Sequence, residues 1–423
     1  MKEQKQKAWD WIESNKQNGV QLLQKLVQEK SVQHEEAPAQ AIILEKCRQL
    51  QLEIDLWEPG GISLRTHPEF VSTRPHFQDS PNIVAILKGT GKGRSVILNG
   101  HIDVVPEGEQ SQWHDDPYSA KVNNGRVYGR GSTDMKGGNV SLLLAIEAIK
   151  ESKIPLKGDV IFQSVIEEES GGAGTLAAIL RGYKADAAII PEPTNLKIFA
   201  KQQGSMWFRL KVKGRSAHGG TRYEGVSAIE KSYSVIEHIK ELETNRNQRI
   251  TDTLYKNIPI PIPINIGKIS GGTWPSSVAD TVVLEGRCGI APDETVETVK
   301  VEFSNYLDTL KEKDIWFGEH PVEIEWFGAR WLPNDLSLQH DIIQILSNEY
   351  KLIKSEDPTI EASPWGTDGG LLATVGNIPT VVFGPGTTEV AHFPNEYIEI
   401  DKMIDSAKII VSFLIEWCGV LEE

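Results

Sequence analysis

The chain has little cysteine, no long apolar run and a deficit of positive charge, and each shortage excludes a class of protein. Its three cysteines, Cys47, Cys288 and Cys418, lie far apart and form no CxxC pair. This excludes a disulfide scaffold or a cysteine-rich zinc module and fits the reducing cytoplasm. No apolar run approaches the roughly 18 residues that span a bilayer, and the first residues show no apolar signal core. We therefore expect a cytoplasmic protein with no membrane partner.

Basic residues are outnumbered by acidic ones. The sequence has 44 Lys and Arg against 59 Asp and Glu, a formal net charge of −15 at pH 7. Such a surface repels phosphate backbones, so we expect no nucleic-acid partner. There is no GxSxG elbow for a serine nucleophile, and the glycine-rich stretch 129–138 has neither the Walker spacing nor the GxGxxG order. Neither a serine hydrolase nor a nucleotide-binding loop is indicated.

What the chain does contain is an ordinary globular composition, with 39% hydrophobic and 24% charged residues over 423 positions. That length suits two to three domains. The part from about 7 to 57 is predicted as two amphipathic helices, and the Pro- and Gly-rich segment 59–81 as a long surface loop. Apolar strands then alternate with helices: strands at 82–89, 95–100, 160–166 and 185–190, helices at 137–150 and 173–182. This predicts an α/β domain with a mixed, mostly parallel sheet and flanking helices.

The pattern changes near residue 205. Strand, helix, strand, strand, helix and strand are predicted at 205–214, 226–243, 264–269, 281–290, 297–310 and 322–327. The order βαββαβ is typical of a ferredoxin-like α+β domain. The first pattern then resumes, with a helix at 338–350, a strand at 379–384 and a final helix at 400–418. We therefore predict a discontinuous α/β domain, 1–204 and 330–423, into which the segment 205–329 is inserted.

Side chains that can bind a metal follow the strands of the predicted α/β domain. The carboxyl ends of strands in an open α/β sheet form the edge where ligands bind. Imidazole and carboxylate ligands without cysteine suit Zn²⁺, with Mn²⁺ or Co²⁺ as substitutes. Five candidate ligands suit two metals that share one bridging carboxylate. They are His101, Asp134, Glu169, Glu192 and His392.

The spacing of the sequence suggests roles for the acidic residues that lie beside the candidate ligands. Asp103 lies two positions after His101, on the same side of an extended segment, where its carboxylate can take the ring N–H of His101. Adjacent residues of an extended segment face opposite ways, so one of Glu168 and Glu169 can bind metal while the other acts on water as general base and acid. Each residue alone has a simpler explanation, such as a solvated turn for the acidic triplet or a helix cap for Asp134. Their joint position at strand ends favours the metal site.

Seven motifs follow one another along nearly the whole chain: NGHIDVVP (99–106), WHDDPYSA…GRVYGRGSTDMKGG (113–138), EEESGG (167–172), PEPT (191–194), GRSAHGGTRYEG (214–225), WGTDGG (365–370) and AHFPNE (391–396). They resemble the M20 family of metallopeptidases, above all the branch that holds acetylornithine deacetylase and succinyl-diaminopimelate desuccinylase. The resemblance implies a two-zinc hydrolase of amide bonds. Its pattern places His101 and Glu192 on one zinc, Glu169 and His392 on the other, and Asp134 between them. It also implies that Glu168 is the general base and acid.

The resemblance also implies a task for the inserted domain, which in this family is a lid and dimerisation domain. His218 is similar to a histidine that reaches across the dimer and donates a hydrogen bond to the tetrahedral oxyanion. Asn265 and Arg287 stand where the family's lid residues hold the substrate's carboxylate, a task that suits the bidentate fork of arginine. Gly366 and Thr367 resemble a loop that touches the same end of the substrate. A homodimer is therefore expected.

Departures from the family's pattern leave the substrate open. Residues 219–221 read Gly-Gly-Thr where many relatives have a small residue, Ser and Pro, and the segments 59–81 and 258–264 have no counterpart. We predict a dizinc amidohydrolase that removes a formyl, acetyl or succinyl group from a small N-acyl amine or amino acid. An N-formyl aminopyrimidine deformylase and an acyl-lysine deacylase both fit. The alternatives are a metallo-dipeptidase or carboxypeptidase, and a catalytically silent binding or scaffold protein of the same fold.

Overall fold

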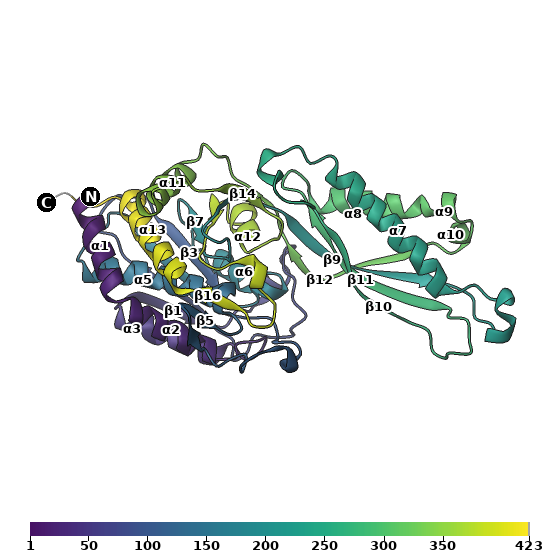
Figure 1. The fold of residues 1–423 in the computed structure, drawn as a ribbon. Helices are drawn as coiled ribbons and strands as arrows, with labels where there is room; N and C mark the ends of the chain where they lie inside the picture. The colour runs from purple at the N-terminus through teal and green to yellow at the C-terminus, as the bar shows by residue number, and fades with distance from the viewer. Residues whose placement is uncertain (422–423) are drawn as a thin grey trace. The chain divides into compact units, whose positions relative to one another are not determined.

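A computed structural model describes residues 1–421 of the chain, which forms two compact units (Figure 1). The first unit comprises Met1–Lys201, Leu336–Glu361 and Thr367–Glu423, and the second comprises Gln202–Asp335 and Ala362–Gly366. Within residues 1–421, no helix combines the length and apolar character needed to cross a membrane.

The first unit is built on a sheet with the strand order β1-β2-β6-β3-β7-β15-β8, and β14 lies beside β8. The pairs β3–β6, β3–β7 and β7–β15 at its centre are parallel, whereas β1, β2 and β8 pair in antiparallel fashion. Every residue of β3 and β6 is buried, as expected for strands covered on both faces. The predicted mixed, mostly parallel sheet is confirmed. The strands are β1 (Glu53–Trp57), β2 (Asn82–Leu87), β3 (Val96–His101), β6 (Val160–Val165), β7 (Ala188–Ile190), β8 (Ile198–Gln202), β14 (Ile360–Ser363) and β15 (Thr380–Val382).

Helices cover both faces of this sheet. The crossover from β3 to β6 and the crossover from β6 to β7 run in opposite directions along the strand order, so right-handed connections put α5 and α6 on opposite faces. Helix α5 packs with α1, α2 and α13, and α6 packs with α4 and α12 (Figure 1). The helices are α1 (Lys2–Ser14), α2 (Lys16–Gln28), α4 (Ile62–Arg65), α5 (Gly137–Glu151), α6 (Ala173–Leu180), α11 (Asp341–Lys354), α12 (Gly369–Thr374) and α13 (Ile400–Cys418).

The N-terminal part differs from its prediction as two helices. Asn15 separates α1 from α2, and α3 (Ala37–Gln49) begins with a proline in its first turn, where a missing N–H costs nothing. The following segment forms the edge strand β1 instead of continuing a helix. The segment 59–81 is not purely a surface loop either, because the side chains of Arg74, Phe77 and Ser80 are buried.

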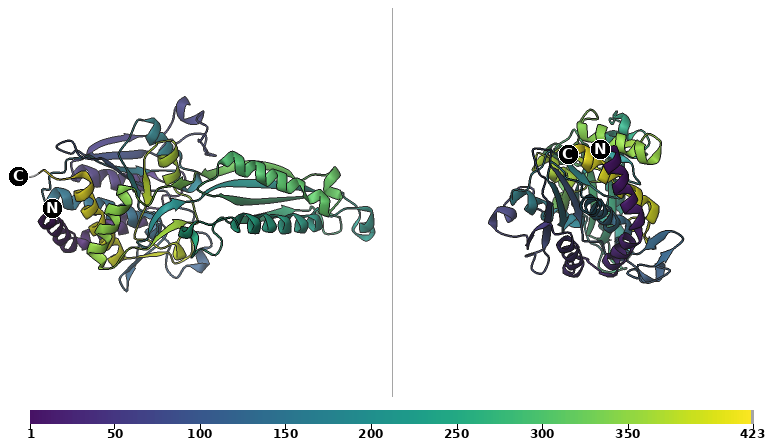
Figure 2. Two further views of the ribbon diagram at one scale, coloured as in Figure 1. Left: turned by 90° about the horizontal axis from the view of Figure 1, so that it is seen from above. Right: turned by 90° about the vertical axis from the view of Figure 1, so that its left-hand side faces the viewer.

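The second unit holds a four-stranded antiparallel sheet in the order β10-β11-β9-β12. Residues of β9 alternate between buried and exposed, so one sheet face is covered. Figure 2 shows α7 and α8 running alongside this sheet. The elements occur in the predicted order βαββαβ: β9 (Gly204–Lys213), α7 (Ala228–Asn247), β10 (Ile264–Gly271), β11 (Thr281–Ile290), α8 (Val296–Asp308) and β12 (Glu323–Trp331), with short helices α9 (Leu310–Lys313) and α10 (Trp316–Glu319) before β12.

Candidate metal centre

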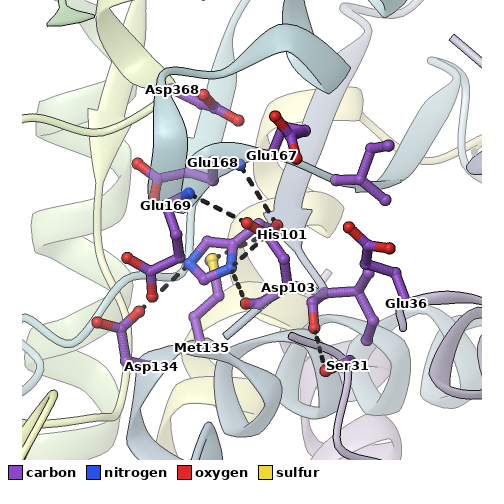
Figure 3. Close-up of polar contacts among 12 residues, drawn as sticks. Ser31, Glu36, His101, Asp103, Asp134, Met135, Glu167, Glu168, Glu169 and Asp368 are labelled. Carbon is purple, nitrogen blue, oxygen red and sulfur yellow. Dashed lines mark hydrogen bonds and ion pairs between the residues drawn. The ribbon is translucent and has the colours of Figure 1, made fainter. Parts of the chain in front are cut away.

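The strands of the first unit deliver the predicted ligands to one edge of the sheet. His101 is the last residue of β3, and Glu192 follows β7. Glu169 lies in a short 3₁₀ turn, Glu168–Ser170, which comes after β6. Asp134 lies in a turn (Ser132–Lys136) before α5, where its own backbone is extended, with φ of −126° and ψ of 96°, and His392 follows a second 3₁₀ turn (Thr388–Val390). Figure 3 shows His101, Asp134, Glu168 and Glu169 directed toward one small region.

Asp134 contacts both histidines through different oxygens. Its Oδ1 lies 3.2 Å from Nε2 of His101, and its Oδ2 lies 3.3 Å from Nε2 of His392. Each histidine has a second carboxylate beside it: Glu192 Oε1 is 3.7 Å from His101 Nε2, and Glu169 Oε1 is 3.2 Å from His392 Nε2. The structure thus brings all five predicted ligands together, with Asp134 between two imidazole–carboxylate pairs.

Two triplets of potential ligand atoms each fall within 4.8 Å of one another. One triplet consists of His101, Asp134 and Glu169, and the other of His101, Glu168 and Glu192. Glu168 is buried, so a fourth carboxylate adjoins the ligand set. His101 is also buried, whereas the side chain of His392 is about half exposed, at 49%. The centre therefore has a closed side at His101 and an open side at His392.

The electrostatics of this cluster call for cations. Burial raises the pKa of Glu192 to about 8, and burial together with Glu192 raises the pKa of Glu168 well above its usual range. Glu169 raises the pKa of His392 to about 12, against the effect of burial. For His101, burial opposes the charged form, but Glu192 and Asp134 outweigh it and raise the pKa. Crowded buried carboxylates are stabilised by bound cations or protons, and the oxygen and imidazole donors present here fit divalent metal ions.

The backbone around His101 fixes the direction of its ring. His101 Nδ1 lies 2.8 Å from the backbone carbonyl oxygen of Asp103, which can only accept, so Nδ1 carries the proton. Nε2 is then the nitrogen that faces Asp134 and a metal. Asn139 on α5 donates to the carbonyl oxygen of His101 at 2.6 Å. These contacts prepare His101 to bind through Nε2.

The carboxylate of Asp103 has a different task from the one that its spacing predicts. Its Oδ1 lies 3.7 Å from His101 Nδ1, too far for a hydrogen bond. Instead, its two oxygens accept the backbone N–H groups of Glu168, at 3.3 Å, and Glu169, at 3.1 Å. The predicted hydrogen bond from His101 to the Asp103 carboxylate is therefore wrong. Asp103 orients the ring with its main chain and holds the acidic triplet with its side chain.

The acidic triplet is not extended, contrary to its prediction. Glu167 adopts a left-handed conformation with φ of 66°, and Glu168 and Glu169 form a 3₁₀ turn after it. Strand β6 ends before the triplet, and the turn begins at once. The argument that neighbours on a strand face opposite ways therefore does not apply, although Glu168 and Glu169 still lie in different ligand triplets.

Two charged residues of this centre have no role in the sequence-based prediction. Glu396 Oε1 accepts the backbone N–H groups of Thr133, at 3.0 Å, and Asp134, at 3.2 Å. Arg130 donates to Glu396 Oε2 at 2.6 Å and to the carbonyl oxygen of His392 at 3.3 Å. Both residues stand inside motifs that the sequence displays, GRGSTD and AHFPNE, next to predicted ligands. Their positions were a usable signal, since ligand-bearing turns are usually hydrogen-bonded by neighbours.

The residues predicted to bind the substrate or to stabilise its oxyanion are divided between the two units. Thr367 is buried in the first unit, and its Oγ1 accepts the N–H of Gly369 at 2.9 Å. The other four lie in the second unit. Among them, Asn265 of β10 pairs with Arg287 of β11, and His218 is exposed with its Nδ1 accepting the N–H of Gly220 at 3.0 Å. The group consists of His218, Asn265, Arg287 and Gly366.

Comparisons with known proteins identify the family of this chain. The N-formyl-4-amino-5-aminomethyl-2-methylpyrimidine deformylases of Halalkalibacterium halodurans and Bacillus subtilis are 34% and 33% identical to this chain; the alignments cover 96% and 97% of it, and the same shares of those proteins. An M20 family metallo-carboxypeptidase from Sulfolobus solfataricus shares the fold, with a TM-score of 0.75 at 18% identity over 95% of this chain and 99% of that one. The sequence profile of peptidase family M20/M25/M40 matches residues 97–416. The predicted resemblance is thus confirmed, and the chain belongs to peptidase family M20/M25/M40.

Proposed function

We propose that this protein is a metal-dependent amidohydrolase that removes the formyl group from an N-formylated aminopyrimidine. The observation that carries the proposal is the similarity, over nearly the full length of both chains, to two deformylases named for such a substrate. Among the acyl groups that the sequence leaves open, this similarity favours formyl. The reaction cleaves a linear amide C–N bond and yields formate and a free amine.

The ligand set supports two divalent cations, which we take to be Zn²⁺, with Co²⁺ or Mn²⁺ as substitutes. His101 and Glu192 would hold one ion, Glu169 and His392 the other, and Asp134 both, since its two oxygens face the two histidines. When bound, the ions act as Lewis acids on the amide carbonyl and lower the pKa of coordinated water. The chain supplies the proton transfers and the orientation.

Glu168 is the group best placed to move protons. It is buried, and a carboxylate oxygen lies within 4.8 Å of ligand atoms of both His101 and Glu192. Glu168 would take a proton from water as the new C–O bond forms, and deliver it to the amine nitrogen as the C–N bond breaks. A buried carboxylate with a raised pKa suits this exchange because it takes up a proton more readily than an exposed carboxylate does.

We assign dimerisation and most of the substrate binding to the second unit, with Thr367 contributed by the first. His218 would donate a hydrogen bond to the oxyanion of a partner subunit's substrate, and Asn265, Arg287, Gly366 and Thr367 would bind the rest of the substrate. Large apolar side chains exposed on this unit support an interface between two copies. They include Tyr223, Ile229, Tyr233, Ile269 and Trp274. Strand β10 is an edge strand of its sheet and offers free backbone groups for pairing.

The state of the cysteines indicates the compartment in which we expect the protein to work. Three unpaired, buried thiols support the cytoplasm as the compartment. The partner is a small N-acyl molecule.

An acyl-release assay tests the function. The zinc-loaded protein is given N-formyl-4-amino-5-aminomethyl-2-methylpyrimidine, the N-acetyl and N-succinyl forms of the same amine, an N-acyl lysine and a set of dipeptides, each with and without chelator. We expect formate release with the highest kcat/KM, abolished by chelator and restored by Zn²⁺. Faster turnover of dipeptides would replace the proposal with a dipeptidase. Metal-dependent binding without turnover of any compound would indicate a silent member of the family.

A further inference from the structure

Segment 59–81 contributes one buried charge to the neighbourhood of the acidic triplet. Arg74 Nη1 lies 2.6 Å from Glu36 Oε1 and 2.9 Å from Glu167 Oε1, and the side chains of all three residues are at most 1% exposed. Arg74 Nη2 donates to Ser80 Oγ at 2.6 Å, and the guanidinium packs over the ring of Phe77. A segment with the composition of a surface loop therefore contains a buried arginine whose guanidinium is held by hydrogen bonds.

Glu167 is the point at which this arginine meets the proposed catalytic turn. Its carboxylate accepts hydrogen bonds from three side chains. Arg74 and Gln33 donate to Oε1, the latter at 3.0 Å, and Ser72 donates to Oε2 at 2.8 Å. Its backbone carbonyl oxygen accepts the N–H of Gly172 at 2.7 Å, which closes the turn. Glu167 directly precedes Glu168 and Glu169, so its position sets where their backbone begins.

The turn is fixed from two directions. The carboxylate of Asp103 holds the N–H groups of Glu168 and Glu169 (Figure 3). The Arg74 contact holds Glu167 at the start of the turn. Without Arg74, two buried carboxylates, Glu36 and Glu167, would lose their shared cation and repel each other. Moving Glu167 outward relieves that repulsion, and the residues attached to it must follow.

Arg65 offers a comparison within the same segment. Its guanidinium lies near the rings of Phe70 and Phe77, and it donates to the carbonyl oxygen of Arg74 at 3.4 Å. These contacts stay inside segment 59–81. Arg74, in contrast, leaves the segment to reach Glu36 at the start of α3 and Glu167 after β6. A substitution of Arg65 therefore disturbs only the packing inside segment 59–81, whereas a substitution of Arg74 also removes the contact between the segment and the turn.

We propose that Arg74 is a positioning residue for the catalytic turn, acting through Glu167 to place Glu168 and Glu169. Segment 59–81 is then a working part of the active site and not a surface insertion. The assignment of chemistry to Glu168 and Glu169 rests on the proposed function. The physical claim, that Arg74 holds residues 167–172 in place, does not.

The first experiment measures the turn itself. Hydrogen exchange followed by mass spectrometry is applied to the purified, zinc-loaded protein and to R74M, R74K and R65K, for peptides covering 166–172. We expect exchange in these peptides to be at least about 10-fold faster in R74M, intermediate in R74K, and unchanged in R65K. Wild-type exchange in both Arg74 variants would overturn the proposal. If R74M does not fold, R74K alone decides, because a lysine keeps the charge but lacks the second nitrogen, Nη2, with which Arg74 also donates to Ser80.

The second experiment measures the consequence for catalysis, with zinc content recorded for each sample. We expect kcat per zinc-loaded site to fall about 10- to 100-fold in R74M and less in R74K, with KM within about threefold, since a small displacement of the base lowers turnover more than binding. A lower melting temperature of R74M with unchanged kcat would overturn the proposal and leave Arg74 a purely structural residue. If the wild-type protein turns over none of the compounds, the proposed function fails, while the exchange data still decide the role of Arg74.

Discussion

Arg130 and Glu396 form a buried ion pair, with 2.6 Å between Nη1 and Oε2, that is hydrogen-bonded to the backbone of two proposed metal ligands. Glu396 holds the N–H of Asp134, and Arg130 holds the carbonyl oxygen of His392. These two ligands come from different parts of the sequence, and one ion pair ties them to each other. The pair therefore connects Asp134, the proposed bridging ligand, to the half-exposed His392.

Glu396→Gln is expected to weaken metal binding as well as stability. The substitution keeps the shape but leaves the buried Arg130 without its counter-charge, which costs about 3–5 kcal/mol of unfolding free energy. Loosening of Asp134 and His392 should lower zinc affinity about 10- to 100-fold. Competition with a chromogenic chelator measures the affinity, and denaturant unfolding of the metal-free protein measures the stability.

Glu399→Gln is the matched control for that variant. Glu399 lies three positions after Glu396 in the sequence. It pairs with Arg126 at 3.2 Å, and both side chains are about one-third exposed. An exposed pair contributes at most about 1 kcal/mol, so zinc affinity should be unchanged. Equal zinc affinity in Glu396→Gln and the wild-type protein would show that the buried pair does not position the ligands.

Glu168→Gln is expected to remove turnover and keep the metal. Glutamine cannot take a proton from water, so kcat should fall about 10²- to 10⁴-fold. The five proposed ligands remain, so the zinc content per subunit should match the wild type. Elemental analysis and single-turnover kinetics on the same sample check both statements. A variant that keeps wild-type kcat would exclude Glu168 as the base, and one that loses zinc would make it a ligand, as its position beside His101 and Glu192 allows.

The sequence predicts that the proposed ligands converge because the strand pattern carries most of the geometry. His101, Glu169 and Glu192 follow β3, β6 and β7, and parallel strands end at one edge whatever the details of their packing. The order of helices and strands in the second unit follows from alternation in the same way. The parts of the fold with strong hydrophobic periodicity are therefore the parts that pattern analysis recovers.

The missed contacts depend on information that periodicity does not contain. Arg74 and Glu167 are 93 positions apart, and Arg130 and Glu396 are 266 apart. A single charged residue has no period, so nothing in a loop such as 59–81 distinguishes a buried arginine from a solvated one. The spacing of His101 and Asp103 likewise could not show whether a side-chain or a main-chain oxygen takes the ring N–H.

The three thiols are expected to be unreactive in the native protein. Burial raises the pKa of Cys47, Cys288 and Cys418 to about 12 each. At pH 8 the thiolate fraction is then about 10⁻⁴, and it rises about tenfold for each pH unit below that pKa. A chromogenic disulfide reagent should titrate no thiol in the native protein and three in guanidinium chloride. A native thiol that reacts within minutes would contradict this prediction, and loss of turnover with that reaction would place a cysteine in or beside the active site.

Mixing two inactive variants tests whether His218 acts across a dimer. His218→Ala should lower kcat strongly and keep zinc, because His218 lies in the second unit and the five proposed ligands in the first. Glu168→Gln is inactive for a different reason. Refolding or subunit exchange of the two variants in equal amounts gives mixed dimers as about half of the population.

Only action in trans restores activity in those mixed dimers. The subunit that keeps Glu168 then receives His218 from its partner, so one of two sites is complete and the mixture should reach about a quarter of wild-type activity. If His218 serves its own subunit, every site in every dimer lacks one group and the mixture stays inactive. A monomer by sedimentation at micromolar concentration would contradict the dimer before any mixing is done. The same samples therefore decide both the oligomeric state and the site that His218 completes.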